Sequence, residues 1–337
     1  MQQLFFIEPG KVEWREAPEP RLESDRDALV RPLAVSTCDL DRSLLKGEAP
    51  VPGPFAFGHE FVAEVVETGD AAGVQPGERA LVSFQISCGE CEFCRRGHTG
   101  NCAEVQPTAM YGLQPLAGEW GGAFADLVRV PYARSMLQPL PEGVAPATVA
   151  SAADNVSDGW RTIAEPLRQR PGERVLIVGG GAPSVSLYTV QAAVALGAGA
   201  VDFADDDPER LALAESFGAR VLEGELPKRF GQYPITVDAS SAHEGLACAL
   251  RSTAPEGVCT SVGIYFEEQT PVPLLEMFSK GITFKTGRVH SCSAAPEVLE
   301  LVAAGKLAPE RVTTRTVAWD DLAEALADPP LKLVAER

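Results

Sequence analysis

Hydrophobic residues in the first 150 positions fall into short runs separated by Gly and Pro. Four runs are rich in β-branched and aromatic residues and read as strands: Ala28–Val35, Phe61–Glu67, Arg79–Phe84 and Phe124–Pro131. Turn residues at Gly77-Glu78 and at 141–143 separate such strands. This pattern predicts a mostly β domain, either a barrel or a sandwich.

The pattern changes near residue 150, where Ala145–Ala153 and Trp160–Leu167 predict helices. A short apolar strand, Arg174–Val178, then ends at three glycines. Further along, strands and helices alternate: a helix at Ser184–Leu196, a strand at Ala200–Ala204, a helix from Pro208, and strands at Ile235–Ala239 and Gly257–Gly263. Such alternation predicts an α/β domain with a parallel sheet covered on both faces.

The last fifty residues predict helices at Pro296–Ala304 and Leu322–Ala327, which we expect to pack onto the first domain. The expected organisation is therefore one domain over residues 1–152 and 290–337, and a second over 153–289. A chain of 337 residues is long enough for two such cores.

Composition narrows the function classes. The net charge of −18 repels phosphate backbones and anionic lipid, so we expect no nucleic-acid partner and no membrane partner. No apolar run approaches the ~18 residues that span a bilayer. The N-terminus lacks the basic start of a signal peptide, and we expect a cytoplasmic protein.

Four of the eight cysteines lie close together in the pattern Cys88-x2-Cys91-x2-Cys94-x7-Cys102. Four thiolates in one short loop can surround a zinc ion tetrahedrally and leave no open position, which is typical of a structural site. Four unrelated thiols and a nucleic-acid zinc ribbon are the alternatives, and the acidic charge disfavours the second. Cys248, Cys259 and Cys292 are scattered, as buried core residues are.

A second set of possible ligands is dispersed. Cys38 follows a predicted strand, His59 lies in Gly58-His59-Glu60 before another, and Asp154 lies where the two domains meet. One thiolate, one imidazole and one carboxylate balance the charge of Zn²⁺ and leave its fourth position open, as in catalytic sites. From spacing alone, a purely structural His59 stays an open alternative.

The glycines Gly179, Gly180 and Gly181 connect the strand to a helix whose N-terminus can hold a pyrophosphate. Asp205 ends the next strand, where an acid binds the ribose 2′-hydroxyl and repels a 2′-phosphate. Asp206 and Asp207 add to this repulsion, so NAD is expected over NADP. The motif departs from G-x-G-x-x-G at Ser184, so this pattern is weak by itself.

The order of these motifs along nearly the whole chain resembles the zinc-dependent medium-chain dehydrogenases. The Cys88–Cys102 loop, Gly121-Gly122 with Val130-Pro131-Tyr132, and Asp154 preceding Gly159 are most similar to the glutathione-independent formaldehyde dehydrogenase branch. Threonine and sorbitol dehydrogenases resemble the chain more distantly.

The resemblance implies a GroES-like β-barrel domain that carries a catalytic and a structural zinc, a Rossmann domain that binds NAD, and an active site in the cleft between them. It implies that Cys38, His59 and Asp154 are the catalytic zinc ligands and that Glu60 is a neighbouring or exchangeable ligand. Asp41 would hydrogen-bond His59 and orient it.

The resemblance also implies the surroundings of the reaction. Leu40 and Phe84 fall where relatives line the substrate pocket, although Phe84 could equally be a core aromatic. Val262 and Ile264, which flank Gly263, would offer backbone groups to the nicotinamide. Arg288 would contact the pyrophosphate, or be an ordinary surface residue.

Two positions depart from the family pattern. Leu40 replaces the Ser or Thr that passes the proton outward in many relatives, and Asp158 replaces a common Thr beside the nicotinamide. Asp158 could accept the substrate proton, or it could cap a helix that starts near Gly159. The substrate therefore cannot be taken over from a relative.

These observations together predict an NAD-linked, zinc-dependent enzyme that transfers a hydride between an alcohol, or an aldehyde or ketone, and NAD. The resemblance implies a homo-oligomer, either a dimer or a tetramer, acting on a small molecule. The alternatives are a catalytically degenerate zinc- and NAD-binding protein, a structural zinc protein, and a polyol- or threonine-type dehydrogenase.

Overall fold

The computed structural model describes all 337 residues, which divide into two compact units. Unit 1 comprises Met1–Ser157 and Val289–Arg337, and unit 2 comprises Asp158–Arg288. The second unit thus begins at residue 158, whereas the sequence suggested 153. None of the helices is long and apolar enough to cross a membrane.

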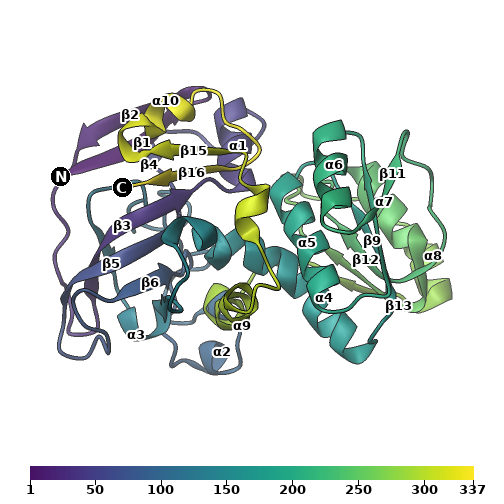
Figure 1. The fold of residues 1–337 in the computed structure, drawn as a ribbon, viewed down its shortest axis with the longest axis horizontal. Coiled ribbons are helices and arrows are strands. Elements are labelled where there is room, and N and C mark those ends of the chain that lie inside the picture. Colours follow the sequence, from purple (N-terminus) through teal and green to yellow (C-terminus); the bar gives the residue numbers. More distant parts are fainter. The chain divides into compact units, whose positions relative to one another are not determined.

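Unit 1 is built on two sheets (Figure 1). The larger has the order β15-β16-β3-β5-β6-β8, with β7 paired to β3, and the smaller has the order β2-β1-β4. Their strands are β1 (Gln2–Glu8), β2 (Lys11–Glu16), β3 (Ala28–Ser36), β4 (Phe55–Ala56), β5 (Glu60–Thr68), β6 (Arg79–Val82), β7 (Val128–Val130), β8 (Leu137–Pro139), β15 (Arg315–Ala318) and β16 (Leu333–Glu336). Aromatic side chains such as Phe6, Phe57 and Phe124 fill one core shared by both sheets.

Short helical segments connect these strands. The α-helices of unit 1 are α1 (Asp39–Lys46), α2 (Glu92–Arg95), α3 (Ala133–Met136), α9 (Ser291–Ala303) and α10 (Leu322–Ala325). The 3₁₀ turns are η1 (Thr99–Asn101), η2 (Pro146–Val149), η4 (Pro309–Val312) and η5 (Trp319–Asp321), and η3 (Ala152–Val156) is a π-helical turn. Residues 289–337 return to unit 1, where β16 pairs antiparallel with β3.

Unit 2 is a parallel sheet with the strand order β11-β10-β9-β12-β13-β14 (Figure 1). The strands are β9 (Arg174–Val178), β10 (Ala200–Asp205), β11 (Arg220–Glu223), β12 (Tyr233–Asp238), β13 (Thr253–Ser261) and β14 (Thr283–Lys285). The helices are α4 (Ser157–Gln169), α5 (Pro183–Ala195), α6 (Pro208–Ser216), α7 (His243–Ser252) and α8 (Leu274–Lys280). The strand order reverses between β9 and β12, and such a switch point is where parallel sheets bind dinucleotides.

Three sequence predictions of secondary structure were wrong. Ala145–Ala153 is a 3₁₀ turn followed by a π-helical turn instead of one helix. The run Phe124–Pro131 forms a strand only at Val128–Val130, because the chain changes sheets there: Leu4 donates its N–H to the Phe124 carbonyl, whereas β7 pairs with β3. Helix α9 starts at Ser291 and includes Pro296, which the sequence suggested as its first residue.

Candidate active site and metal centres

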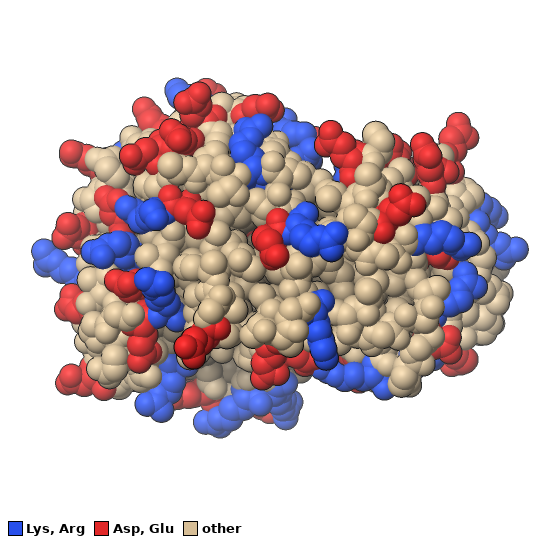
Figure 2. Space-filling model, in the orientation of Figure 1, with Lys and Arg blue, Asp and Glu red and all other residues tan.

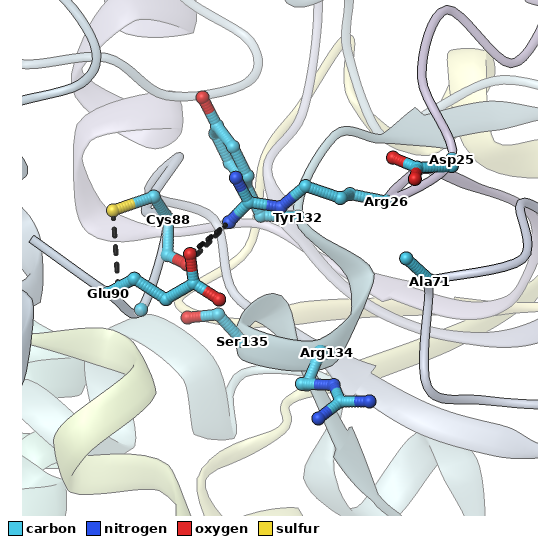
Figure 3. Close-up of a pocket in the computed structure, with 9 residues that line it drawn as sticks. Asp25, Arg26, Ala71, Cys88, Glu90, Tyr132, Arg134 and Ser135 are labelled. Atoms are coloured by element: carbon cyan, nitrogen blue, oxygen red, sulfur yellow. Dashed lines mark hydrogen bonds and ion pairs between the residues drawn. The ribbon is translucent and has the colours of Figure 1, made fainter.

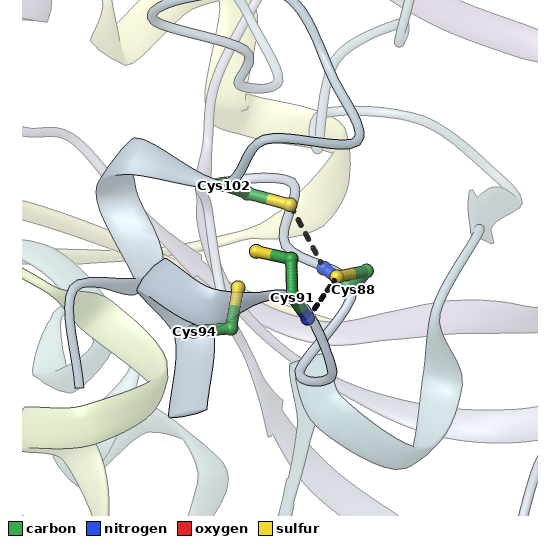
Figure 4. Close-up of side chains that lie close together, drawn as sticks. All are labelled: Cys88, Cys91, Cys94 and Cys102. Atoms are coloured by element: carbon green, nitrogen blue, oxygen red, sulfur yellow. Dashed lines mark hydrogen bonds between the residues drawn. The ribbon is translucent and has the colours of Figure 1, made fainter. Parts of the chain in front are cut away.

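The four clustered cysteines converge in the loop that follows β6 (Figure 4). Their sulfur atoms all lie within 4.8 Å of one another, which suits the four ligands of one zinc ion. Backbone N–H groups point at the sulfurs: Cys91 N lies 3.2 Å from Cys88 Sγ, and Cys88 N lies 3.4 Å from Cys102 Sγ. Burial raises the pKa of Cys91, but the N–H groups of Ala103 and Cys94 more than offset it and lower this pKa to about 6.

A pocket of about 490 Å³ lies beside this cysteine loop (Figure 3). Arg26 crosses it, donates to the Cys88 carbonyl at 3.3 Å and pairs with Glu90 at 3.2 Å. The Arg26 guanidinium also stacks on the Tyr132 ring, 4.8 Å from its centroid. Arg26 therefore connects the segment before β3 to the loop that carries the cysteines.

Cys38, His59 and Asp154 form the second cluster, with ligand atoms within 4.8 Å of one another. Cys38 lies two residues after β3 and caps helix α1, and His59 immediately precedes β5. Asp154 projects from the π-helical turn η3, a distortion that often marks functional positions. His59 Nε2 lies 3.2 Å from Asp154 Oδ2.

Asp41 lies on the other side of the His59 ring. Its Oδ2 accepts the Cys38 N–H at 3.0 Å, and its Oδ1 lies 3.6 Å from His59 Nδ1. Burial lowers the pKa of His59, but Asp41 and Asp154 more than offset it and raise this pKa to about 9. Burial raises the pKa of Cys38, and these carboxylates raise it further. A dication between these donors would replace their protons, so the donor set fits zinc.

Glu60 points into a buried network that the sequence did not reveal. Its Oε2 lies 2.7 Å from Lys332 Nζ, and both side chains are fully buried. Its Oε1 accepts the Asn155 N–H at 3.0 Å. Burial raises the pKa of Glu60 to about 8, although Lys332 counteracts this rise. No sequence pattern around Lys332 indicates that this residue is buried beside Glu60, whereas Asn155 is adjacent in sequence to the expected ligand Asp154.

The two expected substrate-pocket residues lie in unit 1. The Phe84 ring is buried, and its centroid is 5.4 Å from that of the His59 ring. Leu40 is partly buried and packs against the unit 1 core.

Asp158 belongs to unit 2, in the first turn of α4. Its carboxylate pairs with Arg161, which also donates to the Gly287 carbonyl. The helix that it was suggested to cap starts at Ser157, directly after the π-helical turn, so Asp158 lies inside its first turn instead of preceding it.

The glycine turn after β9 is packed against the loop after β12. A Cβ at Gly180 would lie 3.0 Å from Ser240 backbone atoms, and one at Gly181 would lie 2.7 Å from Ser241 Cβ. Helix α5 begins at Pro183, immediately after the turn, so its positive dipole end lies at the switch point. Glycines and helix together form a cradle that fits a pyrophosphate.

Asp205 lies against this cradle, and a Cβ at Gly179 would come within 2.2 Å of its Oδ2. Arg210 holds the carboxylate, with Nε 3.0 Å from both Asp205 oxygens. The same guanidinium pairs at 3.2 Å with Asp206 and with Asp207. Arg210 was not among the residues expected from the sequence, although it lies in the first turn of α6, close to the three acids.

The remaining cofactor candidates lie past the carboxyl end of β13. Val262 follows this strand directly and donates its N–H to the Asp238 carbonyl at 2.9 Å. Gly263 and Ile264 come next, and Ile264 is 51% exposed. Arg288 is the last residue of unit 2.

Comparison with known proteins agrees with this architecture. Residues 24–142 match the alcohol dehydrogenase GroES-like domain, and residues 184–304 match the zinc-binding dehydrogenase domain. A probable zinc-binding alcohol dehydrogenase of Mycobacterium tuberculosis is 28% identical over 334 residues, which cover 97% of this chain and 85% of that protein. The structure of an alcohol dehydrogenase from Thermus sp. ATN1 superposes with a TM-score of 0.88 at 29% identity, covering 100% of this chain and 99% of the other.

The chain belongs to the zinc-dependent medium-chain dehydrogenase family. A glutathione-independent formaldehyde dehydrogenase of Pseudomonas aeruginosa is also similar, at 31% identity over 234 residues that cover 65% of this chain and 58% of that protein. The predicted fold, a GroES-like domain and a Rossmann-type domain, is confirmed. This member of the family is a zinc-dependent, NAD-linked oxidoreductase that acts on a small molecule.

Proposed function

We propose that this dehydrogenase interconverts an alcohol with its aldehyde or ketone at Cys38, His59 and Asp154, which hold a catalytic zinc. The convergence of these three buried donors within 4.8 Å carries the proposal. Bound zinc supplies a Lewis acid for the substrate oxygen, and bound NAD supplies the hydride acceptor. The Cys88–Cys102 cluster holds a second, structural zinc, because four protein ligands leave no position for substrate.

The neighbouring side chains shape this site. Asp41, 3.6 Å from His59 Nδ1, orients the imidazole so that Nε2 faces Asp154 and Cys38. Phe84 lies against the same ring and forms an apolar wall for the substrate. With Leu40 in place of a hydroxyl, the proton leaves by another route, and the pH profile of an Asp158 variant tests whether that route includes Asp158.

We propose the cofactor site at the carboxyl edge of the unit 2 sheet. Gly179–Gly181 and the start of α5 hold the pyrophosphate, with Arg288 as a further contact. Asp205 binds the ribose, and Val262–Ile264 contact the nicotinamide. The three acids 205–207 outnumber the single cation Arg210, so NAD is preferred over NADP.

Two variants and a control test the catalytic cluster. His59→Ala and Asp154→Ala should each retain the fold and one zinc per chain, and should lose turnover of a panel of alcohols followed by NADH absorbance. His98→Ala alters an exposed histidine and should behave as the wild type. Two zinc ions and normal turnover in either active-site variant would refute the assignment.

The same experiment tests the alternative that the protein is catalytically degenerate. This alternative is supported by Leu40, which occupies the position of the hydroxyl that passes the proton outward in relatives. Such a protein would bind NADH and show no turnover with any alcohol of the panel. A panel that includes polyols and threonine also identifies a polyol- or threonine-type dehydrogenase.

We further propose that the chain forms a homodimer through an exposed apolar surface of unit 2. Leu274, Leu275 and Phe278 on α8 are 66%, 78% and 83% exposed. The adjoining strand β14 is an edge of the sheet and can pair with a second copy. Light scattering should find a dimer that Leu275→Asp converts to monomers, whereas Leu116→Asp, at an exposed leucine of unit 1, should not. A dimeric Leu275→Asp variant would contradict this interface.

We also infer a reducing compartment such as the cytoplasm. All eight cysteines are unpaired, and the four thiols of the structural cluster must stay reduced to bind zinc.

A further inference from the structure

Asp238 is a fully buried carboxylate at the carboxyl end of β12, next to the switch point of the unit 2 sheet. Its Oδ1 accepts hydrogen bonds from the Ser240 N–H at 3.1 Å and from the Ser240 hydroxyl at 2.5 Å. Its Oδ2 accepts from the Ser261 hydroxyl at 2.7 Å and from the Tyr265 phenol at 2.9 Å. These donors satisfy a buried carboxylate to which no lysine or arginine is paired, and they connect the loop after β12 to the segment after β13.

The Oδ1 side of Asp238 faces the glycine turn. Ser240, which this oxygen holds, accepts the Gly181 N–H on its carbonyl at 2.8 Å. The next residue, Ser241, has a φ of +51°, a backbone conformation that residues other than glycine rarely adopt. Such a conformation persists only where neighbouring contacts fix it. Asp238 supplies these contacts through Ser240, and it thereby fixes the loop against the turn proposed for the pyrophosphate.

The Oδ2 side of Asp238 holds the segment proposed for the nicotinamide. Val262 donates its N–H to the Asp238 carbonyl at 2.9 Å, and three residues later the Tyr265 hydroxyl returns to the Asp238 carboxylate. Gly263 and Ile264 lie between these two anchors and make no hydrogen bonds within the chain. A Cβ at Gly263 would lie 2.8 Å from Tyr265 Cε2, so the Tyr265 ring packs closely against this segment. The backbone groups of residues 263 and 264 are therefore held in place and remain available to a ligand.

The Tyr265 phenol keeps its proton and acts as the donor. Burial raises the pKa of Tyr265, and the Asp238 carboxylate raises it further. The Tyr265 ring stacks on the His243 ring, with centroids 6.2 Å apart and planes inclined by 19°. The Ala242 carbonyl lies 3.4 Å from the same hydroxyl, so the Asp238 carboxylate is the closer acceptor.

We propose that Asp238 and Tyr265 are positioning residues for the cofactor, because their hydrogen bond fixes the nicotinamide segment Val262–Ile264 relative to the pyrophosphate turn. A segment that is ordered before binding loses less conformational entropy when the cofactor binds, which increases affinity. Tyr265 serves the nicotinamide end alone, whereas Asp238 also holds the pyrophosphate end through Ser240. This inference rests on the proposed cofactor site at the carboxyl edge of the unit 2 sheet.

Two ligands that share the pyrophosphate and differ in the nicotinamide separate these roles. Isothermal titration calorimetry measures the binding of NADH and of ADP-ribose to the full-length protein. Tyr265→Phe removes one hydroxyl and should bind NADH about tenfold more weakly, while its affinity for ADP-ribose stays within about twofold of the wild type. Asp238→Asn should weaken the binding of both ligands. If Asp238→Asn does not fold, Ser240→Ala, which removes only a hydroxyl donor to Asp238, replaces it with the same expected result.

Tyr233→Phe is the matched control. Tyr233 also donates its hydroxyl to a buried aspartate, Asp202, at 2.6 Å, but it is the first residue of β12 and lies at the opposite edge of the sheet. This variant should bind both ligands as the wild type does. Unchanged NADH binding in Tyr265→Phe, or an equal weakening of NADH and ADP-ribose, would overturn the role of Tyr265. Unaltered ADP-ribose binding in Asp238→Asn would overturn the role of Asp238 at the pyrophosphate end.

The wild type shows whether the underlying cofactor site fails instead. A wild-type protein that binds neither NADH nor ADP-ribose lacks this site, and the proposed function then fails first. Normal binding of both ligands by the wild type, without a selective loss of NADH in Tyr265→Phe, refutes only the positioning role.

Discussion

The carboxylate of Asp205 is covered by the guanidinium of Arg210, so that the Asp205 side chain is fully buried while Arg210 remains 12% exposed. The negative charge of Asp205, which is expected to set the preference for NAD, is thus partly neutralised by a cation five residues further along the chain. Arg210 also pairs with Asp206 and Asp207, which leaves this corner of unit 2 with a net negative charge.

This relationship predicts opposite effects for the two residues on cofactor preference. Arg210→Ala leaves three acids uncompensated and should weaken NADPH binding by about tenfold or more relative to NADH. Asp205→Ala frees Arg210 for a 2′-phosphate and should shift the ratio toward NADPH. Titration of NADH and NADPH fluorescence measures both ratios in the absence of turnover.

A matched control is Arg220→Ala, which removes an arginine that pairs with Asp202 on β10, away from the three acids. Its NADPH-to-NADH ratio should equal that of the wild type. A ratio unchanged by Arg210→Ala as well would show that Arg210 does not influence cofactor choice.

The cysteine loop should contribute to stability through its metal. Cys91→Ser removes one of four ligands, so the variant should lose one zinc per chain and unfold at least about 10 °C lower. Metal analysis and circular dichroism melting measure these effects. Cys292→Ser alters a thiol outside both clusters and should keep both zinc ions. Full zinc content and thermal stability in Cys91→Ser would exclude a structural metal here.

The metal-free protein should lose stability as the pH rises. The pKa of His59 is raised from 6.5 to about 9 by Asp41 and Asp154, which outweigh the lowering effect of burial. A raised pKa in the folded state adds stability that is full below pH 6.5 and is lost as the pH passes 9, here about 3 kcal/mol. Burial raises the pKa of Glu60 to about 8, which acts in the same direction.

Urea unfolding of the chelator-treated protein at pH 6.5 and 9.5 measures this loss. His59→Gln has no titrating imidazole and should show a smaller difference between the two pH values. An equal difference in both proteins would place the titrating group elsewhere.

Some elements of the fold could be predicted from the local sequence, because their burial produces a recognisable run of apolar residues. Strand β9 has the predicted bounds, Arg174–Val178, because a fully buried parallel strand is a continuous apolar run. The four-cysteine cluster was predictable for a similar reason, since ligand types and spacing restrict the chemistry. The dispersed set of Cys38, His59 and Asp154 was expected from the resemblance to a family and did not follow from spacing alone. The π-helical turn that contains Asp154 could not be predicted, because its residues, Ala152–Val156, have the composition of an ordinary helix.

The pattern of apolar and polar residues along the chain does not indicate which distant residues meet through tertiary contacts. Lys332 contacts Glu60 across a sequence separation of 272 residues, and the two are brought together by the pairing of β16 with β3 and of β3 with β5. A lysine in a loop before a strand is ordinarily a surface residue. Its burial follows from the register of the sheet, and the register of a distant strand cannot be derived from one sequence.

The ion pair between Asp158 and Arg161 changes what is expected of the acid beside the proposed nicotinamide site. A carboxylate whose charge is balanced by an arginine in the next turn adds little to the local potential, so its preference for the positive ring of NAD⁺ is largely cancelled.

Asp158→Asn should therefore alter the ratio of NAD⁺ to NADH affinity by less than about threefold and leave the pH profile of kcat in place. Arg161→Met, in contrast, leaves the acid uncompensated and should favour NAD⁺ over NADH. Fluorescence titration and initial rates across pH 6 to 10 measure both variants. A displaced kcat profile in Asp158→Asn would instead identify Asp158 as the proton acceptor that replaces the hydroxyl missing at Leu40.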